Sequence, residues 1–349
     1  MSKKIVCVVP TIRPESHAKF LSMWRELFKM HSVTLVTVWD GDSPRITVDD
    51  FSSPSVQKEE EEEVLCDGLT SRSVRELPGF ENNRDLFCRR TDACRNLGFV
   101  KAAELKADYV LTLDDDVYPL SYCDPILQHL EALNLKTSLC WMNTADSFHT
   151  KTVYVRGIPY TSRTEAPVML SHGVWYGVPD LDGETQLKME SEGNGIVDLF
   201  FHVGTIPKGV LFPLCGMNVM VRKEALPYFY FAPMGPDTGI EGLHRFADIF
   251  MGIFLKREFD DLGWGCATGY SAVHHSRASD AKKNMEAERL GREWLEDVAS
   301  WVDVSIFYRR ISRFDIGTDN NEVMTKYFRD YGAKRQKYAS LIRDIQGRK

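Results

Sequence analysis

The chain has 349 residues, of which 43% are hydrophobic and 27% are charged, and its formal net charge is −7. A chain of this size and composition can bury a full hydrophobic core. The acidic balance argues against a nucleic-acid partner, whose phosphate backbone needs a basic surface. It leaves room for a phosphorylated small ligand, because a local basic cluster or a bound metal ion is enough to hold one.

Targeting and redox signals favour a cytoplasmic protein. No stretch reaches the ~18 consecutive apolar residues of a membrane-spanning helix, so we expect no membrane span. The short apolar run near the N-terminus ends at Pro10 and lacks a small-residue cleavage site, which argues against a secretory signal. The eight cysteines contain no CxxC pair, so we expect reduced thiols rather than disulfides or a zinc site.

Strand-like and helix-like segments alternate in the N-terminal third. Continuous β-rich apolar runs predict strands buried on both faces, and apolar residues three or four positions apart predict helices. In chain order the expected elements are a strand at 5–9, a helix at 17–30, a strand at 33–38, a helix at 91–105 and a strand at 109–113. This alternation is typical of an α/β domain built on an open, mostly parallel sheet.

Two further segments have distinctive compositions. Residues 43–74 contain five consecutive glutamates at 59–63, and we expect a variable acidic insertion that forms a solvated loop or a mobile segment. Residues 140–235 are rich in glycine, proline and aromatic residues, which favours short strands and ordered loops over the sheet.

The C-terminal part is charged and helical in pattern. Helices are expected at 285–302 and 321–345. We therefore predict one α/β domain over 1–282, followed by a helical C-terminal extension over 283–349. The sequence leaves open whether this extension packs on the domain or joins a second copy in a homo-oligomer.

Polar residues follow each of the three expected strands. Ligands of open α/β sheets bind beyond the carboxyl ends of the strands, so these residues are the first candidates for a site. The three clusters are Thr11 with Arg13, Asp40 with Asp42, and the acidic triplet 114–116.

The acidic triplet points to a metal ion. Adjacent carboxylates repel one another unless a cation compensates them, and Mg²⁺ and Mn²⁺ prefer oxygen ligands. Because alternate residues of an extended segment point to the same side, Asp114 and Asp116 could share a metal while Asp115 faces elsewhere. The alternatives are a solvated acidic turn and a helix N-cap formed by Asp116. His275 could complete the coordination, or it could be structural.

The other strand-end clusters allow two interpretations each. Asp40 and Asp42 could accept hydrogen bonds from a ribose or a base, or they could form an Asp-Gly turn. Arg89, Arg90 and Arg95 precede and enter the helix expected at 91–105, where they could meet a diphosphate or solvate a helix face.

Arg156 and Arg163 lie among aromatic and apolar residues, a costly environment for an unpaired guanidinium. They could clamp phosphates, pair with buried acids or take part in the chemistry. A nucleophilic arginine is rare because its pKa stays above ~12.

Nine ordered segments together resemble one family. They read VPTIRP, VWDGD, CRRTDACRNLGF, LTLDDDV, VRGIPYTSR, SHGVWYGVPDLDGETQ, TIPKGVLFPLCGMN, RFADIFMG and HHSRAS. In these segments the chain is similar to the reversibly glycosylated polypeptide family, whose best-known members are the plant UDP-arabinopyranose mutases. The resemblance runs from about residue 8 to about residue 279.

The resemblance implies a glycosyltransferase-A type (nucleotide-diphospho-sugar transferase) fold, a nucleoside-diphosphate sugar as substrate, a divalent metal (Mn²⁺ or Mg²⁺) and no redox cofactor. The implied metal ligands are Asp114, Asp116 and His275. The residues expected to bind the nucleotide are Thr11, Arg13, Asp40, Asp42, Arg89, Arg95 and Asp115. Those expected to bind the sugar are His172, Trp175, Lys208, Cys215, Gly216 and Asn218. The expected catalytic residues are Arg156, Arg163 and Asp248.

Members of the family interconvert the pyranose and furanose rings of a nucleotide-linked sugar. The resemblance implies that Arg156 captures the anomeric carbon as the diphosphate leaves, so that the tethered sugar can open and reclose. Arg163, seven residues later, would stabilise phosphate charge or orient Arg156. The alternatives on the same fold are a glycosyltransferase that uses a separate acceptor, and a self-glycosylating protein without mutase activity.

The chain departs from the plant pattern near the expected sugar loops. Val117 stands where the plant motif has cysteine, and Ala247 stands where it has the first of two acids. The stretches SRTEA and DAKKN also differ from their plant counterparts. These differences leave the sugar and the base open between UDP-arabinopyranose and GDP-fucose types.

Overall fold

The computed structural model describes residues 3–41, 45–52, 58–63, 83, 85–143, 154–163, 165–178, 180–192, 204–234, 243–276, 280–300 and 322–348. Asp42, one of the expected nucleotide-binding residues, lies outside these ranges.

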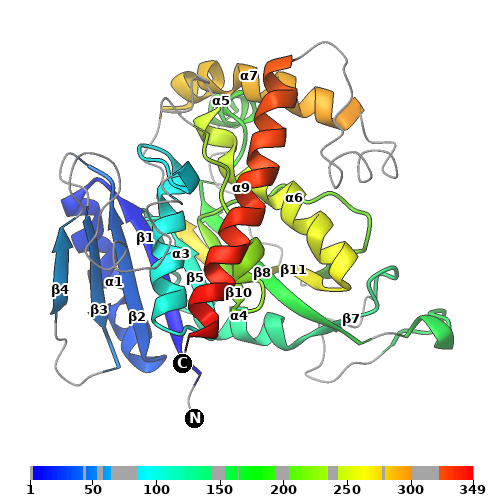
Figure 1. The fold of residues 1–349 in the computed structure, drawn as a ribbon, viewed down its shortest axis with the longest axis horizontal. Helices are drawn as coiled ribbons and strands as arrows, with labels where there is room; N and C mark the ends of the chain where they lie inside the picture. The colour runs from blue at the N-terminus through cyan, green and yellow to red at the C-terminus, as the bar shows by residue number, and fades with distance from the viewer. Residues whose placement is uncertain are drawn as a thin grey trace.

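An 11-stranded sheet forms the centre of the molecule (Figure 1). Its main path runs in the order β4-β3-β2-β1-β5-β10-β8-β11-β6, while β7 pairs with β8 and β9 with β11. The strands are β1 (Ile5–Thr11), β2 (Val33–Trp39), β3 (Arg45–Asp50), β4 (Lys58–Glu63), β5 (Tyr109–Leu113), β6 (Val117–Pro119), β7 (Lys136–Thr137), β8 (Ala166–Gly177), β9 (Gly204–Thr205), β10 (Asn218–Arg222) and β11 (Gly265–His275).

The sheet consists of parallel blocks joined by antiparallel strands. β1 pairs in parallel with both β2 and β5, and β8 pairs in parallel with β11. β10 lies between β5 and β8 and runs against both of them. The expected α/β domain with parallel central strands is confirmed, although antiparallel pairing is more extensive than the sequence pattern predicted.

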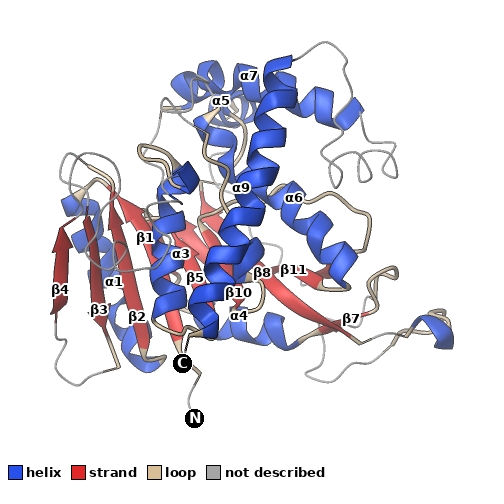
Figure 2. Ribbon diagram, viewed as in Figure 1, coloured by secondary structure: helices blue, strands red, loops and turns tan. Residues whose placement is uncertain are grey.

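Helices cover both faces of the sheet (Figure 2). They are α1 (Pro14–Met30), α3 (Arg95–Glu104), α4 (Pro125–Asn134), α5 (Gly183–Ser191), α6 (Ala247–Leu262), α7 (Ala281–Ser300) and α9 (Glu322–Gly347). Successive residues of β1 point to opposite faces. Val6 and Val8 belong to the core under α3, whereas Cys7 and Val9 belong to the core under α1.

The helix α1 follows its expected apolar spacing. Phe20, Trp24 and Phe28 are all buried against the sheet, and a proline occupies the first turn, where no backbone donor is lost. The Trp24 Nε1 donates a hydrogen bond to the Val117 carbonyl at 2.9 Å. This bond ties the helix to the residue that immediately follows the acidic triplet.

The expectation of a solvated loop across the glutamate run is wrong. Residues 58–63 form β4, which pairs antiparallel with β3 at the edge of the sheet. The physical reason is that an edge strand needs hydrogen bonds on one side only and tolerates charged residue types, which also discourage further strand pairing. An acidic composition therefore did not exclude a strand here.

The C-terminal helices pack on the domain. Tyr230 stacks between Tyr331 and Tyr338 of α9, with ring centroids 5.8 and 4.7 Å apart. The Tyr331 hydroxyl donates to the Tyr230 carbonyl at 2.8 Å. Residues of the C-terminal extension are therefore part of the main hydrophobic core. The domain boundary that we predicted at residue 282 stays a prediction.

Within the described part of the chain, no helix combines the length and the apolar character needed to cross a membrane. The described cysteines are free thiols, most of them buried.

Gly98 lets α3 approach β1 closely. A Cβ at this position would lie 2.3 Å from Val8 Cγ1. We expect Gly98→Ala to lower the free energy of unfolding by about 1–3 kcal/mol in urea denaturation, because the added methyl overpacks the core, even though alanine is intrinsically the better helix former by ~1 kcal/mol. Gly347→Ala, with nothing within 4 Å of the added Cβ, is the matched control and should not destabilise. A stabilised Gly98→Ala variant would contradict this packing.

Candidate functional site

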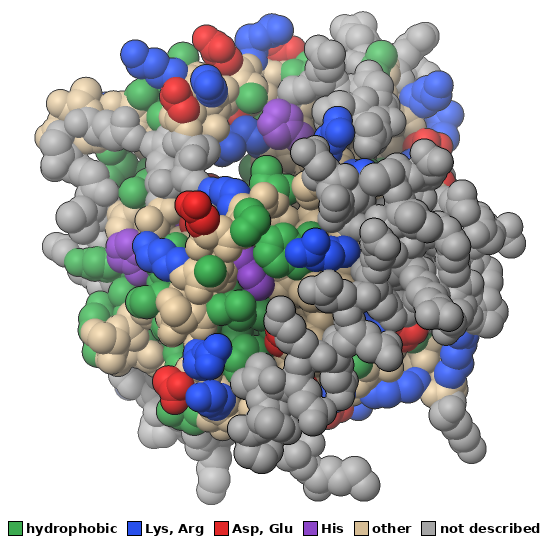
Figure 3. All heavy atoms as spheres, turned by 90° about the vertical axis from the view of Figure 1, so that its left-hand side faces the viewer, with side chains coloured by type: hydrophobic (Ala, Val, Ile, Leu, Met, Phe, Trp, Pro, Cys, Tyr) green, Lys and Arg blue, Asp and Glu red, His purple; other side chains and the backbone are tan. Residues whose placement is uncertain are grey.

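A cavity of about 520 Å³ opens beside the acidic triplet. Its lining includes Asp114, Asp116 and His275, residues 180–182 and 215–217, the start of α6, and one face of α7. α5 and α7 lie over this end of the sheet (Figure 1). Seen from the side of β3 and β4, the surface is hollowed, with Lys or Arg and His side chains at the rim (Figure 3). The volume falls within the range of roughly 300–1,000 Å³ that is typical of small-molecule sites.

Asp115 is held inside the protein. Its side chain is 3% exposed and accepts hydrogen bonds from Thr11 Oγ1 at 2.5 Å and Arg13 Nε at 3.2 Å. A second Arg13 nitrogen donates to the other carboxylate oxygen. The structure thus brings together the residues at the ends of β1 and β5, as expected, but it uses Asp115 to anchor Arg13. Of these three residues only Arg13 lines the cavity.

Asp114 is anchored by Arg95. The Arg95 guanidinium is buried and donates to Asp114 Oδ1 at 2.8 Å, to Thr112 Oγ1 at 3.0 Å and to the Gly216 carbonyl at 2.8 Å. It also lies over the Phe231 ring, 4.8 Å from the centroid. Arg95 lines the cavity, yet most of its donors are already engaged by the protein.

Strand pairing brings His275 to Asp116. β11 runs antiparallel to β6 with His275 opposite Val117, and His275 Nε2 lies 3.9 Å from Asp116 Oδ1. His275 Nδ1 donates a hydrogen bond to the Val178 carbonyl at 2.7 Å, because a carbonyl oxygen can only accept. In the neutral imidazole the proton is then on Nδ1, and the lone pair of Nε2 is free to bind a ligand. Burial and the charge of Asp114 raise the pKa of Asp116 to about 6.

Asp116 and His275 are therefore the two residues that could supply ligands to a cation. No three His, Cys, Asp or Glu side chains come together as a complete metal cage among the described residues. Mg²⁺ and similar ions commonly take one or two protein ligands and complete their sphere with substrate phosphates and water, so the pair fits that type of site.

Asp40 and Arg89 form a pair beside the cavity. Arg89 Nε donates to Asp40 Oδ1 at 3.2 Å, and a second Arg89 nitrogen donates to the Gly41 carbonyl at 2.7 Å. Burial raises the pKa of Asp40. Neither residue belongs to the described lining of the cavity.

Two of the expected sugar-binding residues do line the cavity. Cys215 and Gly216 lie on the turn before β10, and the Gly216 N–H donates to Asp248 Oδ2 at 2.9 Å. A Cβ at Gly216 would lie 2.7 Å from the Phe231 ring. Glycine is therefore needed for the turn to pass between this ring and the cavity.

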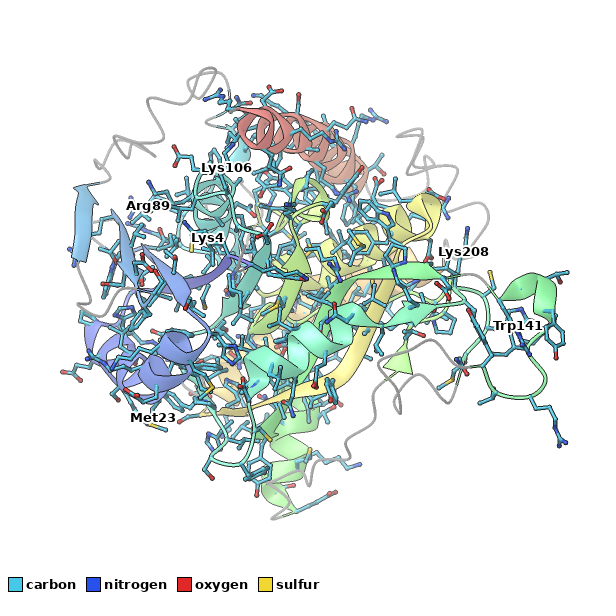
Figure 4. The ribbon with its side chains drawn as sticks, turned by 90° about the horizontal axis from the view of Figure 1, so that it is seen from below. Lys4, Met23, Arg89, Lys106, Trp141 and Lys208 are labelled. Atoms are coloured by element: carbon cyan, nitrogen blue, oxygen red, sulfur yellow. The ribbon has the colours of Figure 1, made fainter. Side chains whose placement is uncertain are left out.

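The other expected sugar-binding residues lie elsewhere. Burial lowers the pKa of His172 to about 3, so the ring is neutral, and its Nε2 accepts from the Cys215 N–H at 3.4 Å. Trp175 packs edge-on against His172, and Asn218 bonds to His129 in the core. Lys208 is exposed on the opposite side of the molecule from Arg89 (Figure 4). The described cavity lining includes none of these four residues.

Arg156 and Arg163 do not reach the cavity in this structure. Arg156 is exposed, and Arg163 stacks on Tyr160 at 3.9 Å while its Nε donates to the Ile158 carbonyl at 3.3 Å. Their segment, 154–163, lies beyond β7 at the right of Figure 1, away from α5 and α7. The structure does not bring these arginines to the acidic triplet, and their catalytic role stays a prediction.

Asp248 lies in the cavity wall at the start of α6 and is half-buried. Burial and the nearby carboxylates of Asp92 and Asp180 raise the pKa of Asp248 to about 8. Asp248 therefore holds its proton near neutral pH, unlike an ordinary aspartic acid.

Several cavity residues were missed by the sequence reasoning. Asp180 lies within the segment VPDLDGETQ, so its position in that segment could have identified it. Glu288 of α7 gave no such signal, because tertiary packing alone brings it to the site: it accepts from the Gly183 N–H at 2.8 Å and from Arg245 Nε at 3.0 Å. Arg90 also lines the cavity, although the predicted nucleotide-binding residues included its neighbour Arg89 and not Arg90 itself.

Fold and site together define a class of protein. It is an α/β protein with an acidic cavity at the ends of its central strands, in which carboxylates, an imidazole and several guanidinium groups surround a space suited to a small phosphorylated ligand. A model of the family described as "Reversibly glycosylated polypeptide" matches residues 1–312. The chain belongs to this family.

Known relatives agree with this assignment. The chain is 32% identical to "Probable UDP-arabinopyranose mutase 1" of Pisum sativum over 301 residues, covering 83% of this chain and 75% of the relative. It is 33% identical to "UDP-arabinopyranose mutase 1" of Arabidopsis thaliana over 303 residues, covering 83% and 76%. It is similarly 32% identical to "UDP-arabinopyranose mutase 1" of Oryza sativa subsp. japonica over 304 residues, covering 83% and 75%.

The raised pKa of Asp248 gives a stability prediction. Between its unfolded pKa near 3.8 and its folded pKa of about 8, the native state holds a proton that the unfolded chain has lost, so Asp248 makes wild-type stability fall as pH rises. Asp248→Asn removes this effect. The difference in unfolding free energy, variant minus wild type, should therefore increase from pH 5 to pH 8, by up to ~1.4 kcal/mol per pH unit.

Urea denaturation at each pH measures this difference. Asp108→Asn is the matched control, because Lys223 lowers the pKa of Asp108 and its titration is complete below this range. A pH-independent difference for Asp248→Asn would show that Asp248 is ionised in the native protein.

Proposed function

We propose that the chain is a nucleotide-sugar mutase that interconverts the pyranose and furanose rings of a UDP-linked sugar of the arabinose type. The observation that carries the proposal is the polar cavity beside Asp114–Asp116 in a chain that belongs to this family. The names of the relatives favour UDP-arabinopyranose, and GDP-fucose remains the second donor to test. We also propose a glycosyltransferase-A type fold and a cytoplasmic location.

A divalent cation such as Mn²⁺ or Mg²⁺ would neutralise the leaving diphosphate. The Nε2 of His275 and the carboxylate of Asp116 would hold it, with Asp114 close by. Arg13 binds the Asp116 carboxylate and Arg95 binds the Asp114 carboxylate, which keeps both groups in place.

Asp248 has the proton that ring opening requires. The ring oxygen must gain a proton when its bond to the anomeric carbon breaks, and the hydroxyl that recloses the ring must lose one. A carboxylic acid with a pKa of about 8 can donate to the first oxygen and accept from the second near neutral pH. Its hydrogen bond from the Gly216 N–H fixes the carboxyl group in the cavity wall.

Arg156 is proposed as the group that holds the sugar while its ring opens. The retained pair Arg156 and Arg163, with the family's spacing, supports this role. Because Arg156 is exposed outside the described cavity lining, the role requires segment 154–163 to approach the cavity of its own chain or of a second copy. This position also favours the alternative of a transferase that uses a separate acceptor.

One assay separates these functions. The purified chain is incubated with Mn²⁺ and either UDP-arabinopyranose or GDP-fucose, and the nucleotide sugars are resolved by chromatography. A mutase gives a new isomer of unchanged mass, and chelation of the metal should abolish it. Free nucleotide together with a glycosylated acceptor would indicate a transferase, and no turnover of either donor would refute the mutase proposal for these sugars.

Arg156→Ala should abolish isomerisation and leave UDP affinity within about twofold of wild type, because Arg156 lies outside the described cavity lining. Isomer formation and calorimetric UDP titration measure the two effects. Arg289→Ala, on the exposed face of α7, is the matched control and should retain activity. If Arg156→Ala isomerises at the wild-type rate, the proposed role of this arginine is wrong.

A further inference from the structure

Most cationic groups around the cavity are already paired within the protein. Arg95 is bound to Asp114 and Gly216, and Arg13 is bound to Asp115 and Asp116. Arg245 is paired with Glu288 at 3.0 Å, and Arg292 with Glu184 at 2.9 Å. A diphosphate that enters the cavity therefore meets carboxylates whose partner arginines are largely engaged.

Arg90 differs from these arginines. It lines the cavity and is exposed. Among the described residues its guanidinium forms no hydrogen bond or close ion pair, and it adds only to the positive charge around Asp40. It is thus the cavity-lining arginine that has donors available for an incoming anion.

The backbone of Arg90 is fixed in an unusual conformation. Its φ is +60°, in the left-handed region that disfavours residues with a side chain. Its N–H donates to the carboxylate of Asp40, which Arg89 binds as well. Thr91 continues the turn by accepting from the Ala93 N–H at 3.1 Å. These hydrogen bonds fix the backbone of the turn that precedes α3, and they place Arg90 at the cavity.

The turn itself does not require arginine. A glycine would make the same backbone hydrogen bond to Asp40 and would adopt φ +60° without steric cost. Strained residues that persist at a cavity are commonly retained for what the side chain does. The Arg90 guanidinium, with its planar set of donors, is suited to bind two phosphate oxygens at once.

We propose that Arg90 binds the diphosphate of the nucleotide sugar and is the principal free cationic contact for it in the cavity. This inference rests on the proposed function, because it takes the ligand to be a nucleoside-diphosphate sugar. Binding of the diphosphate was expected of Arg89 and Arg95. In the structure Arg89 forms an ion pair with Asp40 and Arg95 forms one with Asp114, so the inference assigns diphosphate binding to Arg90.

The test compares Arg90→Gly, Arg90→Asn and Arg90→Lys with wild type by isothermal titration calorimetry in buffer containing Mn²⁺. The probes are UDP and uridine, which differ by the diphosphate. Glycine and asparagine both tolerate the left-handed backbone, so the turn is kept while the charge is lost. We expect both variants to bind UDP about 10- to 100-fold more weakly, as for loss of a charge-assisted hydrogen bond.

Three accompanying results are expected. Uridine affinity should be unchanged, Arg90→Lys should recover part of the UDP affinity, and the melting temperature of Arg90→Gly should equal or exceed that of wild type. A merely structural arginine would instead lower the melting temperature when replaced.

Two outcomes would overturn the inference alone. They are UDP affinity within threefold of wild type in both Arg90→Gly and Arg90→Asn, and an equal loss of UDP and uridine affinity. If wild type itself binds neither UDP nor GDP, the proposed function fails and the inference fails with it.

Discussion

The buried guanidinium of Arg95 is the interaction on which the candidate site depends. From the first residue of α3 it binds Asp114 at the end of β5 and the Gly216 carbonyl on the turn before β10. Removing the Arg95 guanidinium would leave the Thr112 hydroxyl and the Gly216 carbonyl without this donor and Asp114 without its cationic partner. The helix, the strand end and the turn are therefore held in one arrangement, and Gly216 in turn positions Asp248.

This arrangement concentrates negative charge at the cavity. Asp114, Asp116, Asp180 and Asp248 all line it, and the raised pKa values of the last three show that burial and mutual repulsion disfavour full ionisation. In the function proposed above, a bound cation would relieve this repulsion, and a phosphorylated ligand would supply oxygens to complete its coordination.

The sequence predicts the parts of the fold that depend on local pattern. Two examples are the helix with Phe20, Trp24 and Phe28 and the strand before the acidic triplet. Both were expected within a few residues of their observed limits, because the spacing of apolar residues along the sequence indicates which side chains are buried. The edge strand β4 was missed, because its pairing depends on the neighbouring β3 and not on its own composition.

From residue pattern alone, the candidate site was predictable where it coincides with a strand end, whereas Cys215, Gly216 and Asp248 were found through family resemblance. The proximity of Asp116 and His275 needs the register of β6 against β11, which one sequence does not reveal except through family resemblance. The contribution of Glu288 comes from packing of α7 against the first residue of α5. The covalent role of Arg156 was assigned through family resemblance, and the structure places this residue outside the described cavity lining, because a short motif does not determine how its loop packs.

The position of α7 and α9 has a consequence for synthesis of the protein on the ribosome. The central sheet is complete once β11 has emerged, but α7 forms one wall of the cavity, and α9 covers the aromatic face around Tyr230. A nascent chain that ends before these helices would present a sheet with an open cavity and an uncovered apolar surface. Chaperones recognise such surfaces, so the nascent chain stays a chaperone substrate until α7 and α9 have been translated and have packed on the sheet.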